Sequence, residues 1–176
     1  LKFIGGLRFD VPKFGDTGFG NADADRLTFR DEDGSPVQYS TAKLPDAKIL
    51  FSPRLGFNWD VTGDRRTQIR GGSGIFTGPP AYVWISNQIG NTGMLTGFIQ
   101  ATNTKAYPFN PNVDAYKPEP TGNPPSSVDL AVTDHDFRFP QAWRTNVAVD
   151  RMLPWGLIGT GELIYSKDVN GMAYIN

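Results

Sequence analysis

Residues 48–61 alternate between apolar and polar side chains. The apolar side chains occupy the odd positions, which are Ile49, Phe51, Pro53, Leu55, Phe57, Trp59 and Val61. The even positions are polar or small except for Leu50. Because successive side chains of a strand lie on opposite faces, this pattern predicts a strand with one apolar and one polar face. The segment is longer than a typical globular strand of roughly five or six residues, and it meets the roughly 9–11 residues that a tilted strand needs to cross a bilayer.

The same alternation recurs along the chain. It is found in residues 1–11, 67–78, 137–150 and 156–168. The segment 67–78 is weaker, because Phe76 falls among its polar positions. A single strand of this kind is also typical of a soluble β-sandwich, in which one face packs into a hydrophobic core. The lengths of the connections therefore have to distinguish the two folds.

Short and long connections alternate between the predicted strands. Residues 62–66 and 151–155 form short connections, whereas residues 12–47 and 79–136 form long outer loops. Soluble domains rarely contain loops beyond about 12–15 residues without structure of their own, but outer-membrane barrels combine short periplasmic turns with long outer loops. The sequence thus predicts an all-β, antiparallel, up-and-down transmembrane barrel segment of about five strands. Trp59 and Trp155 would belong to an aromatic girdle at the short-turn end.

Composition excludes several classes of function. The net charge is −1 and no block of like charges is present, so nucleic acid is not an expected partner. The absence of cysteine excludes disulfide scaffolds and thiolate metal sites. The sequence contains no apolar stretch of about 18 residues, so it predicts no membrane helix. A β-barrel does not need one.

The predicted strands do not complete a barrel. Residues 1–11 begin the alternation at once, and residues 170–176 run on from the last strand. An open sheet leaves backbone N–H and C=O groups unpaired at both edges, which lipid does not tolerate. We therefore expect this chain to be part of a larger protein.

Several segments resemble TonB-dependent outer-membrane receptors. The resemblance rests on residues 51–60 (FSPRLGFNWD), 62–64 (TGD) and 69–76 (IRGGSGIF). Residues 136–146 (DFRFPQAWRTN), with Asp150 and residues 153–156 (LPWG), are similar to the Oar-like branch of that family. Members of this branch carry a carboxypeptidase-regulatory-like domain and are common in Bacteroidetes.

The resemblance implies a barrel of about 22 strands closed by an N-terminal plug, in the outer membrane of a Gram-negative bacterium. It implies active uptake of large solutes, such as peptides or oligosaccharides, with energy relayed by TonB. The expected partners are outer-membrane lipid, the plug and remaining strands of the same protein, and TonB through the plug. We expect no enzyme activity and no cofactor. The alternative is a secreted β-sandwich binding module with long ligand-recognition loops.

Charged residues on the polar faces are candidates for contacts inside the barrel. The predicted lumen-facing residues are Arg54, Arg70, Arg138, Arg144 and Glu162. The arginines would pair with plug carboxylates or, across neighbouring strands, with Asp60, Asp150 and Glu162. Structural pairing is the favoured interpretation over contact with a solute.

The outer loops contain a weak candidate for ligand recognition. Tyr82, Trp84 and Asn87 combine aromatic area with hydrogen-bonding groups, as recognition surfaces do. The favoured alternative is that these aromatic side chains pack against the base of the loop.

Three groups of residues have the composition of metal or phosphate sites. Asp23, Asp25 and Glu32, with Asn21, have the spacing of a calcium loop, but Arg26 replaces the required glycine, so a solvated acidic loop is favoured. His135 lies between two aspartates, and we interpret it as a solvated loop end rather than a metal ligand or a general base. The glycines at 71, 72 and 74 lack the lysine of a phosphate-binding loop and predict a bend or bulge in a strand.

Overall fold

The computed structural model describes residues 1–94, 102, 104–117 and 129–175. The chain forms two compact units. The strand unit comprises Leu1–Phe14, Asp46–Pro80 and Asp136–Asn176, and the loop unit comprises Gly15–Pro45 and Ala81–His135. No helix in these described ranges is both long enough and apolar enough to cross a membrane.

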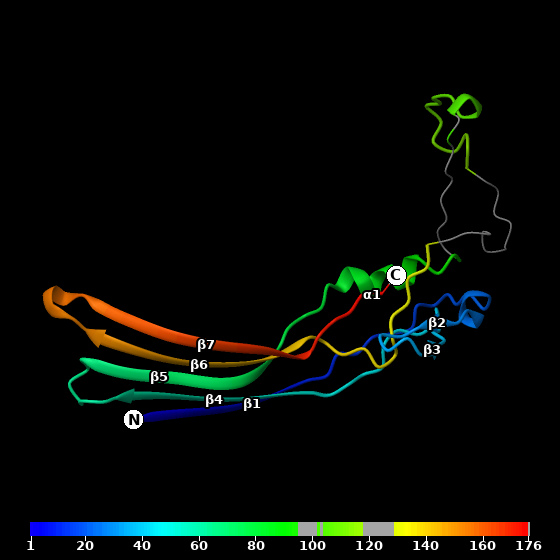
Figure 1. Ribbon diagram of the computed structural model, residues 1–176. Helices are drawn as coiled ribbons and strands as arrows, with labels where there is room; N and C mark the ends of the chain where they lie inside the picture. The colour runs from blue at the N-terminus through cyan, green and yellow to red at the C-terminus, as the bar shows by residue number, and fades with distance from the viewer. Residues whose placement is uncertain (95–101, 103, 118–128, 176) are drawn as a thin grey trace. The chain divides into compact units, whose positions relative to one another are not determined.

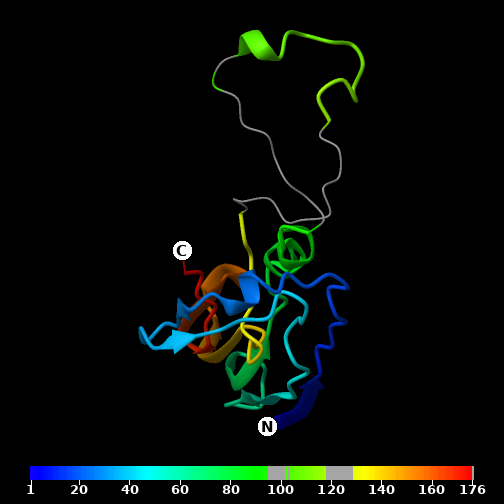
Figure 2. The same ribbon diagram turned by 90° about the vertical axis from the view of Figure 1, so that its right-hand side faces the viewer.

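The strand unit is one antiparallel sheet whose strands are neighbours in chain order (Figure 1). Its strands are β1 (Lys2–Asp10), β4 (Leu50–Asp60), β5 (Thr67–Thr77), β6 (Gln141–Met152) and β7 (Ile158–Asn170). The two short connections, β4 to β5 and β6 to β7, lie at the same end of the sheet (Figure 1). Figure 2 views the sheet nearly along its strands, from the opposite end. The predicted up-and-down antiparallel order is confirmed.

The register places alternate side chains of all strands on two distinct faces. Phe57 lies opposite Phe3 and Gly71, whereas the next residue, Asn58, lies opposite Lys2 and Arg70. We call the first the apolar face; its large side chains are Phe3, Leu7, Phe9, Phe51, Leu55, Phe57, Trp59, Ile69, Ile75, Trp143, Val147, Val149, Leu163 and Tyr165. The polar face carries Lys2, Arg8, Asp10, Ser52, Arg54, Asn58, Asp60, Gln68, Arg70, Arg144, Asn146, Asp150, Thr160, Glu162, Ser166 and Asp168.

The apolar face is exposed rather than packed into a core. Leu55 is 72% exposed and Leu163 is 70% exposed. In the described strand unit the buried apolar side chains are Leu50 and Ala148, and both belong to the opposite face. Because burying one large apolar side chain contributes about 1.5–3 kcal/mol, a whole face of this kind is stable only against another apolar phase.

The observed strands correct several predicted boundaries. The strand predicted at 137–150 begins at Gln141, because Pro140 has no N–H to donate to a ladder. Residues 137–140 precede β6, and the ring centroids of Phe137 and Phe139 are 6.5 Å apart there. The strand predicted at 156–168 begins at Ile158, because Pro154–Gly156 form a 3-10 turn, η3, in which Trp155 has a positive φ of 65°.

Glycines in β5 allow close approach of neighbouring groups. Of the predicted bend or bulge, the bulge is wrong, because residues 71–74 pair regularly on both sides, and the register shift of this sheet lies at Gln141 and Ala142; the bend stays a prediction. A Cβ atom on Gly71 would lie 2.7 Å from the carbonyl oxygen of Asn146 and 2.8 Å from the ring of Phe57. Phe57 thus covers a strip of bare backbone on the apolar face.

The turn between β4 and β5 is fixed by carboxylates. Asp60 accepts hydrogen bonds from the backbone N–H groups of Gly63 and Arg65, both at 3.0 Å. Hydrogen bonds from the Thr62 hydroxyl and from the backbone N–H of Arg66 hold the pKa of Asp64 below its usual value. This turn therefore orders its own backbone.

The loop unit has secondary structure of its own. It contains η1 (Ala24–Arg26), β2 (Phe29–Arg30), β3 (Pro36–Val37), α1 (Tyr82–Gly90) and η2 (Thr104–Ala106). The turn predicted at 33–36 lies slightly earlier, where Gly34, with φ of 80°, donates its N–H to the carbonyl of Asp31. The turn predicted at 123–125 lies outside the described residues.

Candidate functional site

A hydrogen-bonded network crosses the polar face. Arg70 Nε donates to Asp150 Oδ2 at 2.9 Å, and its Nη1 lies 3.9 Å from Glu162 Oε1. The Thr160 hydroxyl donates to Asp150 Oδ1 at 2.7 Å, and Asn146 Nδ2 donates to Glu162 Oε1 at 2.8 Å. The network joins β5, β6 and β7, and each such cross-strand pair contributes about 0.2–1 kcal/mol.

The other predicted arginines are placed differently. Arg54 lies over the ring of Phe76, with its guanidinium carbon 4.4 Å from the ring centroid. Arg144 lies on the polar face of β6 and is exposed. Arg138 precedes β6, so the strand pattern does not place it on the polar face, and Asp60 serves the turn.

Polar side chains from four strands meet at the end of the sheet away from the short turns. Gln141 Nε2 donates to Thr77 Oγ1 at 2.9 Å and to the backbone carbonyl of Phe51 at 3.2 Å. The hydroxyls of Ser52 and Thr77 share a hydrogen bond of 2.8 Å, and Asn170 Nδ2 donates to Gln141 Oε1 at 2.8 Å. Backbone pairing between β4 and β5 stops at Arg54, so these side chains join the strands where the ladder ends.

Gln88 connects α1 to two other parts of the loop unit. Its side chain is completely buried. The amide nitrogen donates to the carbonyls of Ser40 at 3.1 Å and Lys43 at 2.7 Å, and the amide oxygen accepts from the N–H of Thr133 at 2.9 Å. The side chain therefore joins segments from both long loops.

A second buried group joins the same two loops. Asp25 Oδ1 accepts hydrogen bonds from both the N–H and the hydroxyl of Thr41, each at 2.7 Å. The Thr41 hydroxyl in turn accepts the N–H of Asn21 at 2.7 Å, and Asn21 Nδ2 donates to the carbonyl of Thr92 at 2.8 Å. Together with Gln88, these residues form what we call the loop hub.

The comparisons agree with the two-faced sheet. A family model described as "Outer membrane beta barrel domain" matches residues 4–165 of the 176 residues. The chain belongs to this family. Comparison with curated proteins and with solved structures found no match.

Membership assigns the two faces of this barrel domain. In an outer-membrane barrel the apolar face meets lipid and the polar face meets the enclosed interior. The protein is therefore an outer-membrane protein, and outer-membrane lipid is its partner along the apolar face. The predicted transmembrane barrel fold is confirmed, and the β-sandwich alternative is wrong.

The candidate recognition residues of the barrel domain lie on α1. Tyr82, Trp84 and Asn87 are exposed, whereas Ile85 and Gln88 of the same helix are buried. The helix thus presents two aromatic side chains on its outer surface and uses Gln88 for the loop hub. Their role in ligand binding stays a prediction.

The predicted calcium ligands do not come together. Asp25 is engaged by Thr41, Asp23 pairs with Arg26, and the side chain of Asn21 accepts the N–H groups of Asp23 and Ala24. Among the described residues, Asp23, Asp25 and Glu32 do not form a group of potential metal ligands. Asp25 instead fixes the backbone N–H of Thr41, and Asn21 fixes the N–H groups of Asp23 and Ala24 at the start of η1.

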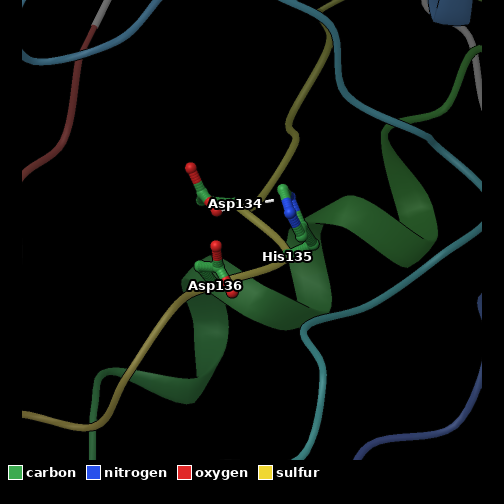
Figure 3. A group of neighbouring side chains, drawn as sticks. All are labelled: Asp134, His135 and Asp136. Carbon is green, nitrogen blue, oxygen red and sulfur yellow. Dashed lines mark ion pairs between the residues drawn. The ribbon is translucent and has the colours of Figure 1, made fainter.

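Three consecutive residues do place potential metal ligands together. One ligand atom from each of Asp134, His135 and Asp136 lies within 4.8 Å of the others (Figure 3). His135 Nδ1 lies 3.5 Å from Asp134 Oδ1, and Lys48 forms an ion pair with Asp136. Lys48 thus neutralises part of the negative charge of Asp136 that would attract a metal cation to this group.

Carboxylates also surround Tyr39 in the loop unit. Burial and then the negative charges of Asp134, Asp31 and Glu32 raise the pKa of Tyr39. Its ring centroid lies 5.7 Å from that of Phe29. This part of the loop unit is therefore acidic and contains an aromatic contact, between Phe29 and Tyr39.

Sequence reasoning missed the residues that hold the loops together. Gln88, Thr41 and Thr92 are buried, but polar residues in long loops are ordinarily solvated. Their partners lie far away in the sequence, so no local spacing marks them. Gln88 lies three residues after the buried Ile85 on α1, but this helix was not predicted, so the spacing gave no signal for Gln88.

Proposed function

We propose that this barrel domain forms part of the wall and outer vestibule of an active transporter of the TonB-dependent receptor type, in its Oar-like branch. The proposed cargo is a large solute of the peptide or oligosaccharide class, taken up across the outer membrane of a Gram-negative bacterium. Its proposed partners are a plug domain against the polar face and TonB acting through that plug. The proposal assigns the chain no catalytic step and no cofactor.

One observation supports this proposal most. The loop hub joins described segments of both long loops, residues 21–43, 88–92 and 133, and structured loops on a rigid scaffold are typical of recognition surfaces. The motif resemblance in residues 51–60 and 69–76 points to the same family of transporters.

Uptake by cells that carry the full-length protein tests the transport proposal. The probes are a fluorescently labelled peptide digest and a labelled oligosaccharide mixture. We expect uptake of one of them, and we expect its loss when TonB is deleted or the proton-motive force is collapsed. Uptake that persists without TonB, or no uptake of either probe, would contradict the proposal.

Variants of α1 test the recognition surface within the same assay. Combined Tyr82→Ala and Trp84→Ala substitutions should weaken binding of the transported probe at least about tenfold, because each removes a large amphipathic contact. Val83→Ala is the matched control, since Val83 is 57% exposed on the same helix but has no aromatic ring. An equal effect of all substitutions would show that the aromatic side chains have no special role.

A further inference from the structure

Two arginines lie in one transverse row of the polar face. The row runs Gly6, Arg54, Gly74, Arg144 and Ser166 across the five strands. Arg54 and Arg144 are thus separated by a single residue without a side chain, Gly74. Strands lie about 4.8 Å apart, so the two arginine backbones are roughly 10 Å apart.

The Arg54 side chain lies over the strand between them. A Cβ atom on Gly74 would be 2.9 Å from Arg54 Cγ, and the guanidinium carbon lies 4.4 Å from the centroid of the Phe76 ring, also on β5. Arg54 therefore leans from β4 toward β6, which carries Arg144. The ring of Phe76, an apolar residue at a polar position, holds the guanidinium there.

These two cations differ from the other arginines on the polar face. Arg70 pairs with Asp150 and Glu162, and Arg8 pairs with Asp10 at 2.6 Å. Within the described residues, neither Arg54 nor Arg144 forms an ion pair, and the buried Nε of Arg54 has no acceptor. Asp168 lies diagonally across from Arg144, beyond ion-pair distance.

We propose that Arg54 and Arg144 together form an oxyanion site on the interior wall of the barrel. The ligand is a carboxylate or phosphate group of a solute in the interior. Guanidinium groups present several N–H donors in a plane that matches such oxyanions. Two like charges separated by one strand in the same row repel each other, and an anion bound between them offsets that repulsion. The inference rests on the barrel fold and the strand register, independently of the transport proposal.

Titration of the full-length protein in detergent with inorganic phosphate, followed by calorimetry, tests this site. We expect saturable binding, which Arg54→Gln and Arg144→Gln each weaken about tenfold or more, as for loss of a charge-assisted hydrogen bond. Acetate should compete, since it presents the carboxylate form of the same chemistry. Asp168→Asn should tighten binding by removing the nearest competing carboxylate on this face.

The control is Arg8→Gln, which removes one positive charge from the same face but leaves both arginines of the proposed site, Arg54 and Arg144, in place. It should change the dissociation constant by less than about twofold. Arg144→Lys keeps the charge and should retain more binding than Arg144→Gln, and heat-modifiable gel mobility confirms that each variant has folded. The proposal is overturned by the absence of phosphate binding, by equal losses in all the arginine variants, or by a carboxylate of the protein itself bound between Arg54 and Arg144.

Discussion

At the scale of single residues, Gln88 determines how the long loops are held. Its buried amide is matched on both sides, by two carbonyls and one N–H. A buried polar group that loses its partner destabilises a protein by about 1–3 kcal/mol. In their described residues, the loops are therefore joined by a few satisfied hydrogen bonds, with Ala24 and Ile85 as the buried apolar side chains.

Replacing Gln88 tests this account. Gln88→Leu should leave the carbonyls of Ser40 and Lys43 unpaired and destabilise the loop unit locally by about 1–3 kcal/mol for each group left without a partner. Hydrogen exchange of the full-length protein should then be faster in residues 40–43 and 131–133. Asn87→Leu is the control, because Asn87 is the exposed neighbour on the same helix. Unchanged exchange in the Gln88 variant would contradict the role of the loop hub.

Residue roles could be predicted only where they follow from alternation. The pattern placed Arg54, Arg70 and Arg144 on one face, since each occupies a polar position of a strand. It could not separate Arg70, which has two carboxylate neighbours, from Arg54 and Arg144, because register between strands decides which side chains meet. It also could not anticipate that Asp60 serves a turn.

At the scale of elements, the strands are long, two-faced and regular. Alternation located all five to within a few residues, because the period of two is a local property of the chain. The predicted start of β6 was wrong, because the alternation of apolar and polar residues continues through 137–139, whereas Pro140 prevents these residues from pairing in the sheet. Helix α1 was not predicted, because it is short and is held by contacts from residues 40–43 and 133.

The packing of Phe57 on β5 gives a prediction for a single element. Gly71→Ala would place a methyl group against the Phe57 ring and the Asn146 carbonyl, and should destabilise the barrel by about 1–3 kcal/mol. The urea midpoint of the full-length protein in lipid measures this change. Gly161→Ala is a matched control, because Gly161 lies on the same apolar face of β7 with no heavy atom within 4 Å of an added Cβ. Equal midpoints for the two variants would show that Gly71 is not sterically required.

At the scale of the whole molecule, the sheet separates two environments. Its apolar face is exposed, its polar face carries a connected network, and the outer edges of β1 and β7 have no strand partner in the described residues. Unpaired backbone groups are not tolerated in lipid, so both edges require further strands in the membrane. The class of fold could be predicted from the sequence because each strand repeats the same two-faced pattern, whereas the folding of the loops depends on distant contacts.

Collision accessibility of spin labels tests the central claim, that one face of this sheet meets lipid and the other an aqueous interior. The chain has no cysteine, so labels can be introduced singly, at Leu55 and Leu163 on the apolar face and at Asn58 and Ser166 on the polar face. In the full-length protein in bilayers, without other cysteines, labels at Leu55 and Leu163 should collide mainly with oxygen. Labels at Asn58 and Ser166 should collide less with oxygen and more with a water-soluble nickel chelate. The same accessibility at all four positions, or the reverse pattern, would contradict the account.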